Sequence, residues 1–126
     1  MATTEPRPTG GRELIRIEVS PREELMRALG ERIRERGIVS AAIVSIIGAV
    51  DACEFSTMPR DDARADLVHD LKEPLELSGS GEVVDGVPHI HCVLATAEGT
   101  ARAGHLRRAW VETWFVHAYL APVVPT

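Results

Sequence analysis

"GEVVDGVPHIHCVLATA", residues 81–97, carries the strongest local folding signal in this sequence. The pair Asp85-Gly86 is typical of a two-residue β-hairpin turn, because such a turn requires a positive φ at both positions. We therefore predict an antiparallel hairpin whose two arms are both strands. Side chains alternate between the faces of a strand, so His89 and His91 project from the same face.

These two histidines are placed to share a metal ion. Their Cβ atoms are roughly 6.5–7 Å apart on a strand, and imidazole nitrogens bind zinc at about 2.0–2.1 Å. The connection over residues 94–104 is short enough for an antiparallel return that places His105 opposite the pair. Three neutral histidines with an open fourth position are typical of catalytic zinc, although imidazole also binds iron, nickel, copper and cobalt. The alternative is that the histidines are only polar residues on a half-exposed sheet face.

Further strands are predicted on both sides of the hairpin. Residues 12–19 alternate, with the apolar side chains on one face. Residues 38–58 are β-branched and largely apolar, which indicates a buried strand, a bend or bulge at Gly48, and a second strand. The same reasoning predicts strands at residues 67–71, at 73–84 with breaks at Gly79 and Gly81, at 102–106 and at 109–120.

One helix is predicted between the first two strands. Ser20 is a favourable N-cap, Pro21 suits the first helical position, and Glu23 completes a Ser-x-x-Glu capping box. Gly37 is expected to end the helix. Apolar residues at three- and four-residue spacing form one stripe, which consists of Leu25, Met26, Leu29 and Ile33.

The order of these elements predicts the fold class. One helix together with many strands is typical of an α+β fold, here with one main helix packed on a mostly antiparallel sheet. The length of 126 residues suits a single domain. Residues 1–10 are rich in Pro and polar groups and have no apolar period, so we predict a disordered N-terminal tail followed by a domain over residues 11–126.

Composition argues against several classes of function. The formal net charge of −5 disfavours strong non-specific DNA binding, which depends on Lys and Arg side chains that neutralise phosphates. No apolar run approaches 18 residues and the N-terminus has no signal-peptide pattern, so we expect a cytoplasmic protein without a membrane span. Cys53 and Cys92 form no CxxC pair and are expected to be reduced, and we assign neither a role.

Two further residues are candidates for proton transfer. Glu112 and His117 lie on the predicted last strand and are the candidate catalytic groups. They fall on opposite faces of that strand, so both cannot face the same site within one chain. A contact between subunits could bring one of them to the ion. His69, next to Asp70, is expected to be solvated.

Four segments in this order give the chain a family resemblance. They are "IVSAAIVSIIGAV" at residues 38–50, "EPLELSGSG" at 73–81, "VVDGVPHIHCVL" at 83–94 and "AGHL" at 103–106. With these segments the sequence resembles the PPC (plants and prokaryotes conserved) family, also called DUF296 or PD1-like DNA-binding domains. The likeness extends from about residue 11 to residue 123.

The resemblance carries its own expectations about structure and site. It implies an α+β fold in which a helix flanks a sheet, and assembly as a homotrimer. It also implies that the histidines of "HIH" and "GHL", here His89, His91 and His105, meet at a metal site that is often zinc in prokaryotic members.

The sequence departs from the family pattern at several positions. Ile46 replaces a second Gly in the family's "SGIGAV", and Arg22-Glu23 stand where its helix starts with Gly-Glu. A Glu of the last strand falls at Val116, and the acidic position after "GHL" falls at Arg108. These changes cluster where a pocket is expected, so the pocket chemistry of typical members is not carried over.

Three functions follow as hypotheses. The first is a trimeric protein with a three-histidine site for a divalent metal, most suitably zinc, which acts as a Lewis acid in an enzyme for a small molecule. The second is a DNA-associated regulatory module, for which the chain offers one basic cluster of Arg102, Arg107 and Arg108. Its N-terminus lacks the Arg-Gly-Arg core of the AT-hooks through which plant members bind DNA. The third is an oligomeric binding protein without catalysis.

Overall fold

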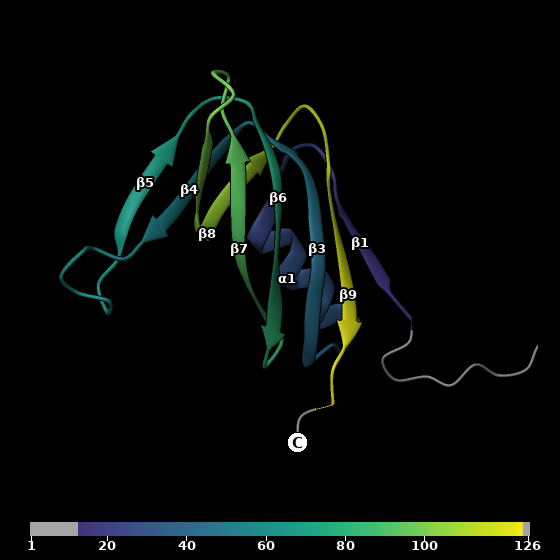
Figure 1. Ribbon diagram of the computed structural model, residues 1–126. Coiled ribbons are helices and arrows are strands. Elements are labelled where there is room, and N and C mark those ends of the chain that lie inside the picture. Colours follow the sequence, from purple (N-terminus) through teal and green to yellow (C-terminus); the bar gives the residue numbers. More distant parts are fainter. Residues whose placement is uncertain (1–12, 125–126) are drawn as a thin grey trace, which may run out of the picture.

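The computed structural model describes residues 13–124, so the predicted tail over residues 1–10 lies outside the described residues. One helix, α1 (Leu25–Glu35), accompanies a nine-stranded sheet in which every pairing is antiparallel (Figure 1). The order across the sheet is β1-β9-β3-β6-β7-β8-β4-β5, and β2 pairs with β8. The strands are β1 (Ile15–Val19), β2 (Glu23–Glu24), β3 (Ser40–Val50), β4 (Ala52–Thr57), β5 (Leu67–Leu71), β6 (Leu75–Val84), β7 (Val87–Ala95), β8 (Ala101–Val111) and β9 (Val116–Pro122).

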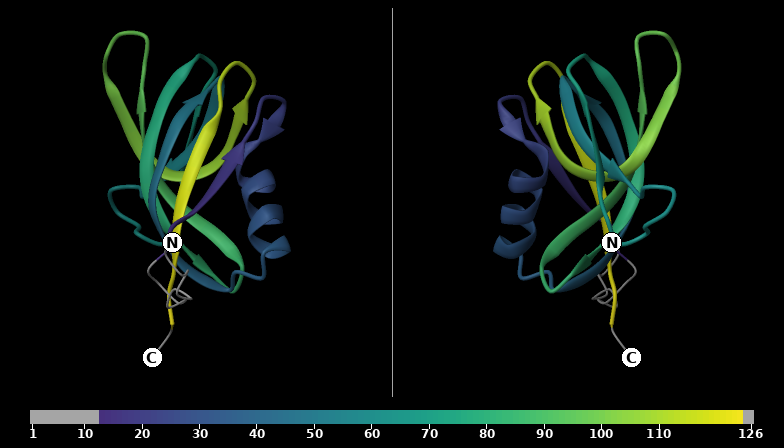
Figure 2. Two further views of the ribbon diagram at one scale, coloured as in Figure 1. Left: turned by 90° about the vertical axis from the view of Figure 1, so that its right-hand side faces the viewer. Right: turned by 90° about the vertical axis from the view of Figure 1, so that its left-hand side faces the viewer.

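The helix covers one face of this sheet and leaves the other face open. Figure 2 shows α1 on one side of the curved strands, and its apolar stripe of Leu25, Leu29 and Ile33 is fully buried. The prediction of one helix on an antiparallel sheet is therefore confirmed, although strands make up far more of the chain than α+β suggests. Within the described residues no helix is long and apolar enough to cross a membrane.

The helix starts later than its sequence predicts. Glu23 does accept a hydrogen bond from the Ser20 N–H at 2.8 Å, but this bond closes a turn. Arg22 has a φ of 74° and its N–H donates to β8, so the next two residues form the short strand β2. Glu24 is the actual N-cap, because its carboxylate accepts hydrogen bonds from backbone N–H groups of the first turn. The helix then begins at Leu25.

The predicted end of the helix is confirmed at Gly37. Gly37 has a φ of 68°, and its N–H donates to the Arg34 carbonyl at 3.0 Å. The Ile38 N–H donates to the Ile33 carbonyl at 3.1 Å. These two bonds form a Schellman motif, which satisfies carbonyls that the helix leaves free.

The hairpin on which the fold prediction rests is also confirmed. Asp85 and Gly86 have φ values of 52° and 76°, as the expected turn requires, and Val84 pairs with Val87. The same register extends along β6 and β7 as far as Glu76 and Ala95, the longest uninterrupted pairing of the sheet.

The predicted breaks at Gly79 and Gly81 are wrong. Both glycines lie inside β6, directly opposite Cys92 and Ile90 of β7. A methyl group on either glycine would overlap a backbone carbonyl oxygen of β7. Glycine is therefore required here so that two strands can approach closely, and it does not interrupt the strand.

Two other predicted boundaries are corrected. β3 runs through Gly48 to Val50, and its register shift lies earlier, between Ile43 and Ile46. The predicted last strand is two elements, because β8 continues to Val111 and β9 begins only at Val116. The connection between them is held by Asp51, whose carboxylate accepts hydrogen bonds from two backbone N–H groups and one hydroxyl of that connection.

Candidate metal centre

The structure brings the three predicted histidines together on the open face of the sheet. His91 of β7 and His105 of β8 are direct partners across the two strands, and His89 lies two residues before His91. One ring nitrogen from each lies within 4.8 Å of the other two. His89 Nε2 and His105 Nδ1 are 3.0 Å apart and share a hydrogen bond.

The alternation of β7 fixes the direction of the two side chains. Ile90 and Cys92, on either side of His91, are 0% and 2% exposed and belong to the core. His89 and His91 therefore lie on the solvent face, as the sequence predicts, and the buried Cys92 thiol points away from them. β7 is an interior strand of the sheet, paired with β6 and β8, and it carries two of the three imidazoles, which limits how far they can separate.

The donor set fits a divalent transition metal. Tetrahedral zinc with Zn–N distances of about 2.0–2.1 Å needs nitrogens about 3.3 Å apart. The His89–His105 pair, at 3.0 Å, is close to this spacing, and all three nitrogens lie within 4.8 Å of one another. All three donors are imidazoles, the ligand type shared by zinc, copper, iron and nickel sites. Three protein ligands leave at least one coordination position for a small molecule.

The environment keeps His105 neutral. Partial burial, together with the nearby rings of His89 and His91, holds the pKa of His105 below its usual range. A metal ion needs the neutral ring, so this shift leaves the nitrogen available at neutral pH.

This shift predicts how the metal-free protein responds to acid. The unfolded chain takes up the His105 proton near pH 6.5, whereas the folded chain takes it up only at lower pH, so stability falls as pH drops through that interval. Above about pH 6.5 the ring is neutral in both states and makes no contribution. We expect His105→Gln to lose less stability than the unchanged protein between pH 7.5 and 5, by denaturant unfolding. Equal losses in the two proteins would contradict this account.

Two cavities border the cluster. The smaller, of about 300 Å³, lies on the β6 side and is lined by Ser80, Gly81, Glu82, His89 and His91. The larger, of about 400 Å³, lies toward β4 and the loop that precedes β5. It is lined by Ser56, Thr57, Met58, Asp66, His91, Gly104, His105 and Arg107. A ligand in the larger cavity would contact two of the three imidazoles.

The two predicted proton-transfer groups lie elsewhere in the chain. Glu112 is an exposed residue of the connection between β8 and β9, so the prediction that it shares a strand with His117 is wrong. His117 lies on β9, where its Nε2 is 3.4 Å from a carboxylate oxygen of Glu18. β3 and β6 separate β9 from β7, so three strand spacings, at least about 14 Å, lie between His117 and the cluster. Within one chain, neither residue reaches the three histidines.

His69 is not the solvated residue that the sequence predicts. It lies on β5, stacks on Phe55 with ring centres 5.0 Å apart, and its Nε2 is 2.9 Å from the Thr57 hydroxyl. The Arg102 guanidinium is 3.4 Å from the other ring nitrogen of His69. These contacts hold β4, β5 and β8 together beside the larger cavity.

Two arginines that the sequence offers to DNA are engaged with one carboxylate. Glu54 accepts hydrogen bonds from Arg107 at 3.0 Å and from Arg108 at 2.9 Å. Both guanidinium groups hold the pKa of Glu54 below its usual range. Arg107 also lines the larger cavity, a placement that the sequence pattern did not indicate.

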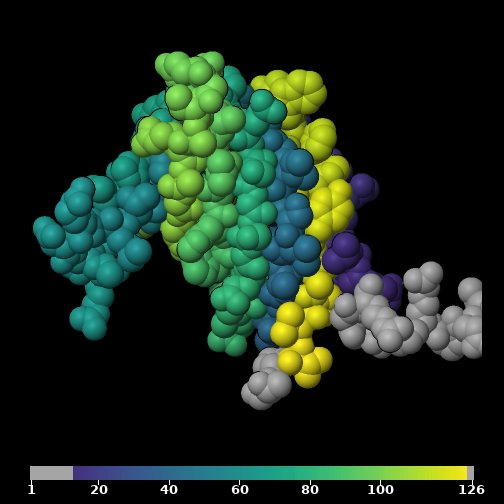
Figure 3. Space-filling model, in the orientation of Figure 1, coloured from purple at the N-terminus to yellow at the C-terminus, as the bar shows by residue number. Residues whose placement is uncertain are grey.

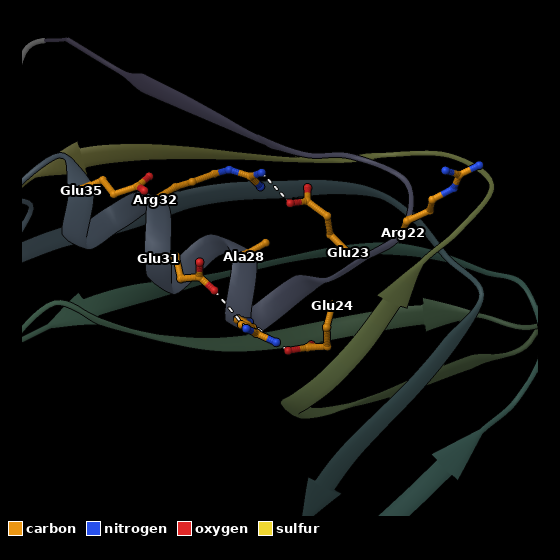
Figure 4. A pocket seen from close by; sticks show the side chains of 8 residues that line it. Arg22, Glu23, Glu24, Ala28, Glu31, Arg32 and Glu35 are labelled. Atoms are coloured by element: carbon orange, nitrogen blue, oxygen red, sulfur yellow. Dashed lines mark hydrogen bonds and ion pairs between the residues drawn. The ribbon is translucent and has the colours of Figure 1, made fainter.

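A separate hollow of about 330 Å³ lies beside α1 and is highly charged (Figure 4). Four of its charged side chains form ion pairs: Arg32 binds Glu23 at 2.6 Å and Arg27 binds Glu31 at 3.1 Å. The Arg32 guanidinium lowers the pKa of Glu23. Because these four side chains are paired and the Glu24 carboxylate caps the helix, this hollow is a weaker candidate for a ligand site than the cavities beside the histidines.

Comparisons with known proteins place this geometry in context. Residues 7–122 match the model of the Plants and Prokaryotes Conserved (PCC) domain. The crystal structure of a plant- and prokaryote-conserved protein from Pyrococcus horikoshii shares 25% identity, with a TM-score of 0.78 over 98% of this chain and 87% of that chain. A metal-containing protein from Archaeoglobus fulgidus shares 29% identity, with a TM-score of 0.74 over 99% and 89% of the two chains.

A third similar structure belongs to a candidate DNA-binding protein from Bacteroides thetaiotaomicron. It shares 19% identity, with a TM-score of 0.77 over 94% of this chain and 83% of that chain, and supports the fold alone. A search of the curated proteins gives no match.

Proposed function

The chain belongs to the Plants and Prokaryotes Conserved domain family, and on that premise we propose that it binds a divalent metal ion at His89, His91 and His105. The observation that carries this proposal is the convergence of three ring nitrogens within 4.8 Å of one another. Zinc is the proposed metal, because three histidines with an open fourth position are typical of catalytic zinc sites. The larger adjoining cavity would then hold a small-molecule ligand next to the ion.

Two features favour a metal centre over histidines that merely occupy a sheet face. The cluster is more than one hydrogen-bonded pair, because a ring nitrogen of His91 also lies within 4.8 Å of nitrogens of both His89 and His105. In addition, the similar protein from Archaeoglobus fulgidus is metal-containing. Both features therefore support a metal centre at these three histidines.

The chemistry would be that of a small-molecule enzyme. When bound, the ion would supply Lewis-acid polarisation of a ligand oxygen. His91 and His105 would orient the ligand by lining the cavity, and Ser56 would offer a polar contact. Glu112 or His117 would take part in proton transfer only if a second chain brought it to the cavity.

Cobalt loading tests the ligand set directly. A Co²⁺ ion held by three imidazoles in a four-coordinate site gives intense visible absorption, whereas hydrated Co²⁺ absorbs weakly. We expect the absorption to saturate at one ion per chain and to be lost in His89→Gln. Absorption that stays at the level of free cobalt would overturn the proposed site.

We also propose that the chain assembles as a homotrimer through the open face of the sheet. Register places His117, Ile47 and Val93 in one row across β9, β3 and β7, with Ser78 of β6 between the last two. Ile47 and Val93 are 54% and 45% exposed, and Phe115 stacks on His117 with ring centres 4.5 Å apart. Figure 3 shows this face as a broad surface over these strands. We propose that the exposed apolar side chains of this strip, Ile47 and Val93 with Phe115 beside them, are covered by the neighbouring chains.

Light scattering with size separation checks the assembly. We expect a mass of about three times the 13.7 kDa of one chain, and a shift toward one chain in Ile47→Glu, because a buried unpaired carboxylate is costly. Val68→Glu is the matched control, since Val68 is 49% exposed but lies on β5, away from the strip. A single-chain mass for the unchanged protein would refute the trimer.

DNA association is the alternative function, and the local electrostatics do not favour it. Of the three arginines in the basic cluster, Arg107 and Arg108 bind Glu54, and Arg102 packs over Phe55 with its guanidinium 5.5 Å from the ring centre. Phosphate binding would have to displace these contacts. A salt-dependent mobility shift of AT-rich duplex would reinstate this alternative.

A further inference from the structure

The volume and the lining residues of the larger cavity beside the histidines indicate what kind of ligand it can hold. It has a volume of about 400 Å³, which suits a small organic molecule and excludes a macromolecular substrate from the interior. Its lining combines the apolar Met58 with small residues of β4 and β8. The charged side chains among the lining residues, apart from the histidines, are Asp66 and Arg107.

Charge balance in this cavity favours an anion once the proposed metal centre is loaded. Three neutral imidazoles leave the full double charge of a divalent ion uncompensated, because none of them is a carboxylate or thiolate. Arg107 adds a further positive charge to the same cavity. Asp66 lines it too, but its single negative charge leaves the loaded cavity positive.

A β-bulge in β8 determines the position of Arg107. Glu54 pairs with Arg108 and Phe55 pairs with Leu106, so Arg107 is an extra residue in a β-bulge. Because of this bulge Arg107 and Arg108 both reach the same carboxylate, that of Glu54. Bulges of this kind re-aim side chains next to functional sites.

The remaining contacts leave Arg107 able to bind a ligand. Its Nε donates to Glu54 at 3.0 Å, which fixes one edge of the guanidinium. Its Nη1 is 3.5 Å from an oxygen of Asp66, longer than a strong charge-assisted hydrogen bond. The Asp66 side chain is 66% exposed, so this ion pair is weak and a stronger anion can replace it.

We propose that this cavity binds a small organic carboxylate, with Arg107 holding the carboxylate group and the rest of the molecule directed toward His91 and His105. The inference rests on the proposed metal centre. A planar carboxylate matches the geometry of a guanidinium edge. A phosphate group would call for several donors, and among residues 13–124 Arg107 is the single guanidinium or ammonium group that lines this cavity.

Calorimetry with pyruvate as the probe tests this inference on the zinc-loaded protein, with zinc content measured on the same samples. We expect the unchanged protein to bind pyruvate and to bind its neutral methyl ester at least tenfold more weakly. Arg107→Gln should weaken pyruvate binding about tenfold or more, because it removes a charged hydrogen bond. Asp66→Asn should tighten it about two- to fivefold, because a competing charge is lost.

Arg108→Gln is the matched control. Arg108 binds the same Glu54 carboxylate but does not line the cavity, so its substitution should leave pyruvate binding unchanged. Zinc-containing protein that binds no pyruvate, or that binds it equally well after Arg107→Gln, would overturn the carboxylate site alone. Protein that takes up no zinc would instead overturn the metal centre on which the inference rests.

Discussion

Replacing His91 by alanine is expected to lower zinc affinity by more than about 100-fold, since changes to residues that only support metal ligands already cost 10–100-fold. His91 is the central ligand of the proposed site: it is the cross-strand partner of His105 and shares β7 with His89. Its side chain is exposed, so its removal leaves the core of the sheet intact. Competition with a coloured zinc chelator measures the affinity of both proteins.

His117→Ala is the control for this experiment. His117 is also a histidine of the open sheet face, but it lies on β9, with β3 and β6 between it and the cluster. Zinc affinity should be unchanged in this variant. If His91→Ala binds zinc as tightly as the unchanged protein, the three histidines are not the ligands.

Replacing Gly81 by alanine is expected to destabilise the fold by about 3 kcal/mol or more, at the upper end of the usual cost of overpacking. The added methyl group would overlap the backbone carbonyl oxygen of His89 and would lie 2.9 Å from the Ile90 Cα. Neither is the end of a flexible side chain, so β6 and β7 must separate. Denaturant unfolding measures the change in the free energy of unfolding.

Ser80→Ala serves as the reference for the strand substitution. Ser80 is the neighbouring residue of β6, is exposed, and already has a Cβ atom, so its change should cost less than about 0.5 kcal/mol. Because Gly81 faces the backbone between His89 and His91, Gly81→Ala should also weaken zinc binding. A stability equal to that of Ser80→Ala would show that the strands can absorb the methyl group.

The features that the sequence predicts correctly depend on local patterns. The Asp85-Gly86 turn needs only two adjacent residues that accept a positive φ, and the structure has both. The apolar stripe of α1 follows from helical spacing, and Gly37 ends the helix through contacts within one turn. The meeting of the histidines combines strand alternation with one short connection, so it too could be predicted.

The errors arise where a distant strand decides the outcome. Glu24 rather than Ser20 caps the helix, because pairing with β8 keeps the preceding residues extended. Gly79 and Gly81 are typical of a strand break in isolation, and only the close approach of β7 explains them.

The sequence analysis missed two residues of the proposed site because their positions also depend on distant strands and loops. Arg107 enters the cavity lining at a bulge that depends on the register between β4 and β8. Asp66 lines the cavity from the loop before β5, and its residue type gives no signal of this. For the same reason the sequence placed Glu112 on a strand, although Asp51 holds it in a connection.

The central claim is that this chain carries one metal ion at its three histidines, and the metal content of the purified, untagged protein tests it most directly. Elemental analysis before and after dialysis against zinc is predicted to give close to one divalent ion per chain, removable by a strong chelator. Less than a tenth of an ion per chain after zinc loading, with the fold intact by circular dichroism, would contradict the account and leave the histidines as residues of a sheet face.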